Sequence, residues 1–285
     1  MIWGYAGIWR REFGVYDVED PVMARLQFLV DRGFHSGGIS LAEMQDPQRR
    51  DQIAQFVAEH DLQLITHPRI RAFGWDDDTI RQKTDEFMAD LQAYKDLLSI
   101  PIVAFGAGPV HRFMEKPSLQ EQLDRLTEVL TPLAAGCYEL GCPLGIENHV
   151  DYYCSDLVEL CGRVPRLGIL LDTGNTYVIG EKPIPAAREA APFVIGTHFK
   201  DHTVYPDEKN LTLVVKGAVL GRGHVGLAEI HRILLENAPD PSRLAMLWEL
   251  VPPGEMDGLE AIEESWKFIR SLPGFDMDIK KRKMP

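Results

Sequence analysis

Short apolar runs rich in β-branched residues alternate along this chain with longer stretches in which apolar residues recur every three or four positions. Eight of the short runs are bounded by residues typical of turns or helix caps, which predicts eight buried β-strands. These runs are Ile2–Ile8, His35–Leu41, Leu62–Pro68, Pro101–Gly108, Pro143–Val150, Leu167–Asn175, Val194–His202 and Leu244–Val251. Their continuous apolar character is typical of parallel strands covered by helices.

The amphipathic stretches between these runs predict eight helices. They are Pro21–Gly33, Gln48–His60, Asp76–Leu98, Ser118–Leu140, Ser155–Cys161, Pro185–Ala190, Leu227–Asn237 and Leu259–Leu272. Ser118 is followed three residues later by Glu121, so we expect a capping box at the start of the fourth helix. The acidic residues that open the third helix favour a helix start at Asp76.

The regular alternation of strands and helices favours one architecture, an α/β fold made of a single (β/α)8 TIM barrel. A doubly wound open sheet is the alternative, but no GxGxxG motif follows the first strand. We expect one barrel domain over residues 1–285, with residues 273–285 as a C-terminal tail. The segment His202–Val225 is predicted to be irregular and lies after the seventh strand, where a functional loop is expected.

Charge and composition exclude some partners. The 285 residues carry a formal net charge of −13, which disfavours binding to nucleic acid or to an anionic membrane. The basic run Lys280–Lys283 is interpreted as a solvated chain end. No signal peptide or membrane-spanning run is expected, and the four cysteines are interpreted as reduced, half-buried thiols, so the chain is predicted to be cytoplasmic.

Four ionisable residues end otherwise apolar strands in the second half of the chain. They are Glu147, Asp172, His198 and Glu249. In a TIM barrel the carboxyl ends of the strands form the active-site face, so these side chains are expected to converge. Three clustered carboxylates repel one another unless a cation lies between them, which favours one divalent metal ion, Mn²⁺, Mg²⁺ or Co²⁺, with Zn²⁺ or Fe²⁺ as alternatives. The simpler interpretation is that they cap strand ends and pair with arginine or lysine.

The order of the short motifs that contain these residues resembles a known family. GIENH, LDTGN, THFKD, GRGHVG and LWEL occur in that order, and the resemblance is strongest from Gly145 to Val251. The set is similar to the xylose isomerase-like TIM barrel superfamily of sugar phosphate isomerase/epimerase type, which also includes inosose dehydratase and endonuclease IV. The resemblance implies that Glu147 and Glu249 bind metal and move protons, while Asp172 and His198 act only as metal ligands.

Two departures from the family pattern bear on function. Many relatives have a histidine where this chain has Asn175, and that histidine often contacts substrate or a second metal ion. Endonuclease IV has an Asp-x-His pair where this chain has Val215-Lys216-Gly217. Both differences, together with the acidic charge, argue against a nuclease.

Other polar and aromatic residues near the expected barrel mouth are candidates for substrate binding. His67 ends the third strand, and Lys200 and His149 lie two residues beyond His198 and Glu147, so each points to the same side as its neighbour. Asp201 could orient one of these groups. The remaining candidates are Trp3, which could stack on a sugar, and Arg222 in the glycine-rich loop.

The sequence therefore predicts a divalent-metal-dependent isomerase or epimerase that acts on a small sugar or ketose by proton transfer through an enediolate. A lyase or dehydratase of the same fold, acting on a keto-inositol or keto-glycoside, is the first alternative. A non-catalytic barrel subunit is a further one. A small carbohydrate is the expected partner, and pairing into a homo-oligomer stays open because it rests on analogy.

Overall fold

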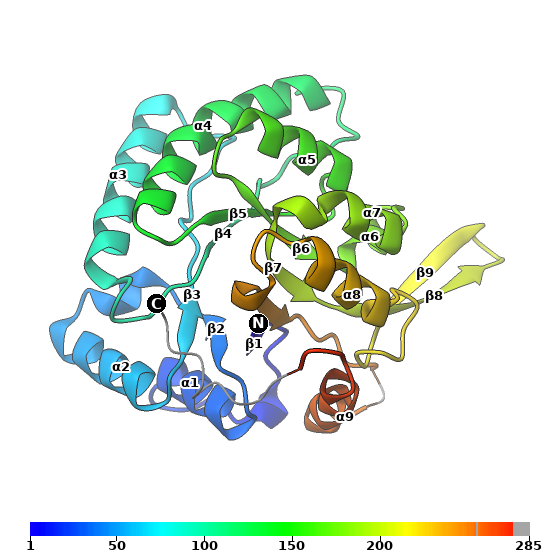
Figure 1. Ribbon diagram of the computed structural model, residues 1–285, viewed down its shortest axis with the longest axis horizontal. Coiled ribbons are helices and arrows are strands. Elements are labelled where there is room, and N and C mark those ends of the chain that lie inside the picture. Colours follow the sequence, from blue (N-terminus) through cyan, green and yellow to red (C-terminus); the bar gives the residue numbers. More distant parts are fainter. Residues whose placement is uncertain (255, 276–285) are drawn as a thin grey trace.

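The protein was analysed as a computed structural model that describes residues 1–254 and 256–275, so the basic run Lys280–Lys283 lies outside the described residues. Eight parallel strands surround a central axis (Figure 1), which confirms the predicted α/β TIM barrel. The strands are β1 (Ile2–Tyr5), β2 (Ser36–Gly38), β3 (Gln63–Ile65), β4 (Val103–Phe105), β5 (Leu144–Glu147), β6 (Gly168–Asp172), β7 (Val194–Phe199) and β10 (Ala245–Trp248). Each is shorter than its predicted run but lies within it.

The sheet closes almost completely. Its strand order is β3-β2-β1-β10-β7-β6-β5-β4, so the first and last barrel strands of the chain are neighbours. The two ends of the sheet, β3 and β4, meet at an isolated parallel bridge between Thr66 and Val103. The backbone N–H of Ala104 donates to the carbonyl of Thr66 at 2.9 Å across this join.

Helices cover the outside of the barrel (Figure 1), as the amphipathic pattern predicts. The longer ones are α1 (Pro21–Asp31), α2 (Pro47–Glu59), α3 (Asp77–Tyr94), α4 (Leu119–Glu139), α5 (Cys154–Arg163), α7 (Pro183–Ala190), α8 (Leu227–Asn237) and α9 (Gly258–Arg270). Short helical turns add α6 (Asn175–Val178), η1 (Arg11–Phe13), η2 (Leu41–Met44), η3 (Ala191–Phe193) and η4 (Pro241–Arg243). The capping box at Ser118 and Glu121 is present as predicted.

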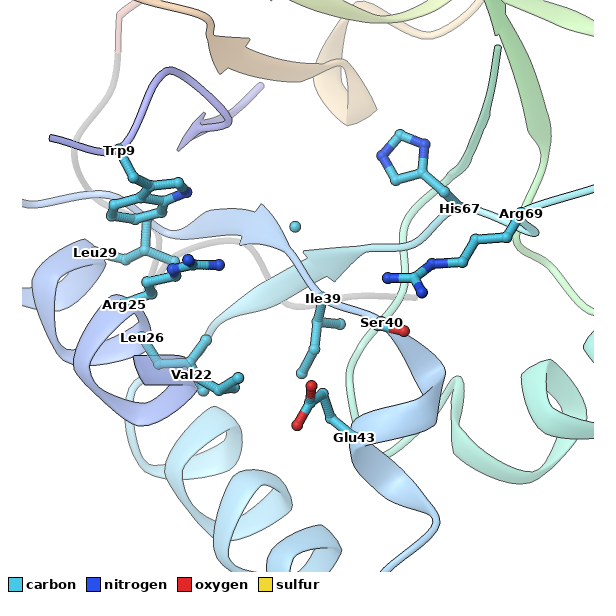
Figure 2. A pocket seen from close by; sticks show the side chains of 11 residues that line it. Trp9, Val22, Arg25, Leu26, Leu29, Ile39, Ser40, Glu43, His67 and Arg69 are labelled. Atoms are coloured by element: carbon cyan, nitrogen blue, oxygen red, sulfur yellow. The ribbon is translucent and has the colours of Figure 1, made fainter. Parts of the chain in front are cut away.

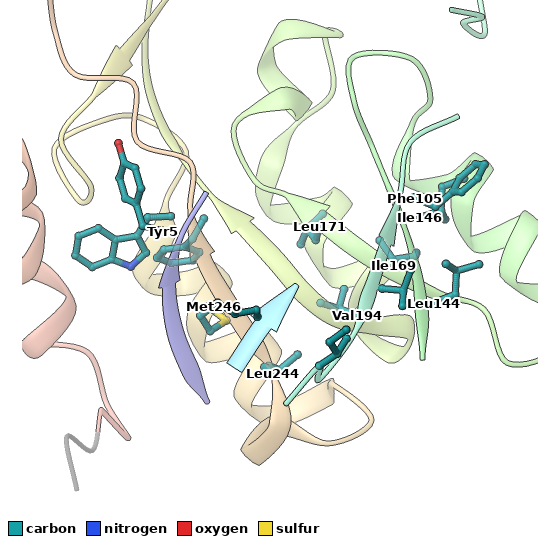
Figure 3. Close-up of a cluster of buried hydrophobic side chains, with 14 of the residues drawn as sticks. Tyr5, Phe105, Leu144, Ile146, Ile169, Leu171, Val194, Leu244 and Met246 are labelled. Carbon is teal, nitrogen blue, oxygen red and sulfur yellow. The ribbon is translucent and has the colours of Figure 1, made fainter. Parts of the chain in front are cut away.

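The buried apolar residues form a large outer layer and a small inner one. The outer layer packs the strands against the helices (Figure 3). The inner cluster fills the barrel with Ile65, Ile102, Ala104, Leu170, Ala245 and Leu247. Gly196 of β7 leaves room for it, because a Cβ atom there would lie 2.8 Å from Ile102 Cδ1 and 3.1 Å from Ala245 O. The barrel interior is therefore a packed core, and only its rim is open to chemistry.

The segment after β7 differs from its prediction. Instead of an irregular loop, residues 201–218 form an antiparallel hairpin of β8 (Asp201–Asp207) and β9 (Thr212–Ala218). The hairpin projects away from the barrel (Figure 1), and Leu211 and Leu213 near its tip are exposed. Because neither face of the outer hairpin is fully buried, the apolar alternation that would have predicted two strands is weak.

The cysteines are unpaired, as predicted, but they are more deeply buried than predicted. All four cysteines are free thiols, and they are fully buried rather than half-buried. Within residues 1–254 and 256–275, no helix has the length and apolar character needed to cross a bilayer.

Candidate metal centre

The four ionisable strand-end residues meet at one rim of the barrel. Glu147 ends β5, Asp172 ends β6, His198 lies in β7, and Glu249 directly follows β10. One possible ligand atom from each residue lies within 4.8 Å of the corresponding atoms of the other three. The strand register accounts for this convergence, because β6, β7 and β10 are adjacent and His198 pairs with both Asp172 and Leu247.

Asp172 is held in one orientation by its own backbone surroundings. Its Oδ1 accepts hydrogen bonds from the backbone N–H groups of Gly174 and Asn175, both at 2.9 Å. Its other oxygen, Oδ2, is completely buried and, among the described residues, accepts no hydrogen bond of regular geometry. The burial raises the pKa of Asp172 to about 7, against the opposing effect of Lys200.

Glu147 and His198 form a close polar pair. Oε1 of Glu147 lies 2.8 Å from Nδ1 of His198, and both side chains are buried. Burial alone would raise the pKa of Glu147, but the imidazole of His198 outweighs it and lowers the pKa to about 2. Burial would likewise lower the pKa of His198, yet the charge of Glu147 raises it to about 9. The carboxylates around His198 therefore favour positive charge between them.

Lys200 supplies part of that charge. Its Nζ lies 2.8 Å from Asp172 Oδ2 and 2.6 Å from Glu249 Oε2, which places it between two of the four candidate ligands. Nζ also donates a hydrogen bond to Asn175 Oδ1 at 3.1 Å. Lys200 was predicted to lie on the same side as His198, and the structure places it there.

The donor set fits a divalent cation. Asp172 Oδ2 and Glu249 Oε2 are buried oxygens within ion-pair distance of Lys200, but no described residue gives either a hydrogen bond of regular geometry. Unsatisfied buried carboxylate oxygens are costly unless a cation binds them. Three carboxylates and one imidazole are a ligand set that Mn²⁺, Mg²⁺, Co²⁺ and Zn²⁺ all accept.

The other predicted polar residues lie at different distances from this cluster. His67 follows β3 and is exposed at the same rim; partial loss of hydration and repulsion from His198 lower its pKa. His149 is exposed at the rim, and its charge acts on Glu147. Asp201 shapes a loop instead, because its carboxylate accepts backbone N–H groups of Gly221, Gly223 and Val225.

The positions of Trp3 and Arg222 do not support their predicted contact with substrate. Trp3 is buried outside the barrel, where its ring stacks on His231 of α8 with centroids 6.1 Å apart. Arg222 is exposed and forms an ion pair with Glu264 of α9. Asp201 turns the glycine-rich loop toward that helix, which accounts for the position of Arg222.

Two residues that shape the site were not identified from the sequence. Asn148 links the ends of β5 and β6, because its Oδ1 accepts from the Asp172 N–H at 2.7 Å and its Nδ2 donates to the Asp172 carbonyl at 2.9 Å. Thr173 joins β6 to the end of β7 through a hydrogen bond from its hydroxyl to the Lys200 carbonyl at 2.7 Å. Both directly follow predicted ligand positions, and that adjacency was the only available signal.

Comparisons with known proteins agree with the TIM-barrel fold of this chain. A sequence profile described as the xylose isomerase-like TIM barrel matches residues 27–272. A comparison with curated protein sequences gave no significant match.

Solved structures of the same fold are similar over nearly the whole chain. D-psicose 3-epimerase with D-tagatose from Clostridium cellulolyticum H10 has a TM-score of 0.69 at 13% identity, covering 95% of this chain and 98% of that one. A xylose isomerase-like TIM barrel protein from Mycobacterium smegmatis in complex with magnesium has a TM-score of 0.66 at 16% identity, covering 88% of both chains. The "probable 3-DHS dehydratase AsbF" from Bacillus anthracis has a TM-score of 0.64 at 16% identity, covering 94% and 98%.

Proposed function

Because the chain belongs to the xylose isomerase-like TIM barrel family, we propose that it is a divalent-metal-dependent isomerase or epimerase of a small sugar or ketose. The observation that carries this proposal is the meeting of Glu147, Asp172, His198 and Glu249 at one rim. The epimerase neighbour with D-tagatose and the neighbour with magnesium support the same reaction class and cofactor.

A divalent ion held by these four side chains would polarise a substrate carbonyl and acidify the adjacent C–H bond. Glu147 and Glu249 then have the role of moving the proton, one removing it and the same or the other returning it to a planar enediolate. The pKa of about 2 keeps Glu147 ionised at neutral pH, which suits a metal ligand. The ammonium of Lys200, 2.6 Å from Glu249 Oε2, orients that glutamate and lowers its pKa.

A lyase is the second candidate, supported by the similarity to a dehydratase of this fold. Both reactions begin with removal of a proton next to a carbonyl, so the same two glutamates serve each of them. The reactions differ in whether the substrate carries a leaving group β to the carbanion.

The test is incubation of the Mn²⁺-loaded protein with a panel of ketoses in D2O, followed by NMR. Deuterium incorporation without loss of any group from the substrate indicates an isomerase or epimerase. Loss of water or of an aglycone indicates a lyase. We expect Glu147→Gln and Glu249→Gln each to slow the reaction at least about a hundredfold. Glu236→Gln, an exposed residue of α8 paired with Arg232, is the matched control.

Full activity in both glutamate variants would contradict the assignment of proton transfer to Glu147 and Glu249. Absence of any exchange with every ketose, in protein shown to hold metal, would contradict the proposed reaction class.

A further inference from the structure

A cavity of about 280 Å³ opens beside the candidate metal centre, between α1 and the ends of β2 and β3 (Figure 2). His67 connects the two, since it lines the cavity and follows the carboxyl end of β3, on the same rim of the parallel barrel as the candidate ligands. Apolar side chains from α1, Leu26 and Leu29, form part of the wall. The cavity is therefore placed to hold the part of a substrate that extends away from the reacting carbon.

Two arginines give this cavity a positive character in an otherwise acidic protein. Figure 2 shows the guanidinium groups of Arg25 and Arg69 pointing toward one another from opposite sides of the space. Among the described residues, no carboxylate lies within ion-pair distance of either guanidinium, although the chain has 43 acidic residues and 30 basic ones. Arg25 Nε is buried and has no hydrogen-bond partner in the described part of the chain.

The surroundings of Arg25 position its side chain without neutralising it, whereas the Arg69 side chain is exposed to solvent. The Arg25 guanidinium lies 5.5 Å from the ring centroid of Trp9 and 5.8 Å from that of Tyr16, contacts that position a cation but accept none of its in-plane N–H groups. Arg69 has a φ of 49°, a left-handed conformation that turns the chain after Pro68.

The acidic side chain that lines the cavity, Glu43, does not neutralise the positive charge of the two arginines. Glu43 lines the wall, but its Oε2 accepts a hydrogen bond from Arg49 Nε at 2.8 Å. Arg49 also binds Asp20, with Nη1 2.9 Å from Asp20 Oδ2. The carboxylate of Glu43 is therefore already paired within this network. The donors of Arg25 and Arg69 are thus left for a ligand.

We propose that Arg25 and Arg69 bind an anionic group of the substrate, a carboxylate or a phosphate, and that the substrate is consequently a sugar acid or a sugar phosphate rather than a neutral sugar. Planar guanidinium groups bind either anion through paired N–H donors. This inference rests on the proposed function for the identity of the substrate as a sugar, but the anion site itself depends only on the two arginines.

The test compares three probes that share a ketose end and differ at carbon 6: fructose, fructose 6-phosphate and fructuronate. Their dissociation constants are measured by calorimetry on the full chain, with Mn²⁺ and in metal-free buffer. We expect one anionic probe to bind at least about tenfold more tightly than fructose. Arg69→Gln and Arg25→Gln should weaken that probe by about tenfold to a hundredfold and leave fructose unchanged.

Two controls keep the result specific. Arg81→Gln removes the same charge from an exposed position on α3, where Arg81 pairs with Asp78, and should have no effect on any probe. Arg25→Lys keeps the positive charge at the half-buried position if Arg25→Gln proves unstable.

Equal binding of all three probes by the unmodified protein would overturn the proposal, as would equal losses of neutral and anionic probes in the arginine variants. The phosphate and carboxylate arms distinguish the two substrate classes. Tighter binding of an anionic probe in metal-free buffer, together with no exchange of any ketose by the metal-loaded protein, would contradict the proposed reaction and leave the anion site standing.

Discussion

Lys200 provides the positive charge that balances two carboxylates of the candidate metal centre. It contacts Asp172 and Glu249, and burial would lower its pKa if these two carboxylates did not raise it above its ordinary value. Asn175, which stands where many relatives have histidine, accepts a hydrogen bond from the Lys200 ammonium and donates one to the Asn148 carbonyl. The asparagine therefore holds the lysine beside the candidate ligands. A protonated histidine at this position could not accept the hydrogen bond from Lys200.

Replacing Lys200 with methionine is expected to change metal affinity and turnover in opposite directions. The ammonium of Lys200 repels a divalent ion and contacts two of the carboxylate oxygens that would bind it. Lys200→Met should therefore bind Mn²⁺ at least about tenfold more tightly, as measured by calorimetry. Turnover should fall, because the donor beside Glu249 is lost. Lys83→Met, which removes an exposed ammonium paired with Glu86 on α3, is the control. Weaker Mn²⁺ binding in Lys200→Met would show that the lysine supports the metal instead of competing with it.

The strand-end rule predicted the four candidate ligands, but it could not separate inward from outward residues in β1. Trp3 and Gly4 are neighbours on opposite faces of that strand, and a Cβ atom on Gly4 would lie 2.6 Å from Leu247 Cδ2 in the barrel interior. Gly4 therefore faces inward and Trp3 faces the helices. Because both faces of a barrel strand are apolar, the sequence carries no alternation from which this could be predicted.

At the scale of elements, the helices were easier to predict than the connections between strands and helices. Residue patterns of 3.6-residue period and capping residues such as Ser118 are local signals, and the helices follow them. The hairpin β8–β9 was missed because its exposed faces weaken the apolar alternation, and the bonds of Asn148 depend on a partner 24 residues away. Such a partner becomes visible only once the barrel has placed its strand ends together.

The helix α8 carries a buried histidine that should make stability depend on pH. His231 stacks on Trp3, both of its ring nitrogens lack hydrogen-bond partners among the described residues, and burial with repulsion from the N-terminal amine lowers its pKa to about 4. In the unfolded chain its pKa is near the ordinary 6.5. The unfolded state therefore binds the proton more readily, and native stability is lost as the pH falls from 6.5 toward 4.

Substituting phenylalanine for His231 is expected to remove this contribution while keeping the ring contact with Trp3. The loss of unfolding free energy between about pH 7.5 and about pH 5 should be smaller in His231→Phe by about 2 kcal/mol. Urea unfolding followed by circular dichroism at the two pH values measures it. His111→Phe, at an exposed position, is the control. An identical pH dependence in His231→Phe and the unmodified protein would show that His231 does not titrate with this shift.

For the whole molecule, the candidate ligands tie together only one side of the barrel. They come from β5, β6, β7 and the end of β10, which are consecutive in the sheet order. The other side, β1 to β3, contributes His67 and the arginine-lined cavity. The two proposals place catalysis and substrate selection on adjacent sectors of one rim. A metal ion bound at the candidate centre would then act on stability only through the first of these sectors.

Removal of metal should therefore lower stability mainly at the strands that carry the candidate ligands. At a Mn²⁺ concentration about 100 times the dissociation constant, binding stabilises the native state by about 2.7 kcal/mol, which raises the Tm by about 5 °C, and EDTA should reverse the change. Hydrogen exchange should slow on metal addition at the ends of β5, β6 and β7 and stay unchanged in β2 and β3. Glu147→Gln should lose most of the Tm shift and Glu236→Gln should keep it. Protection spread evenly over all eight strands would instead point to a metal bound elsewhere, because four ligands on neighbouring strands cannot restrain the opposite wall directly.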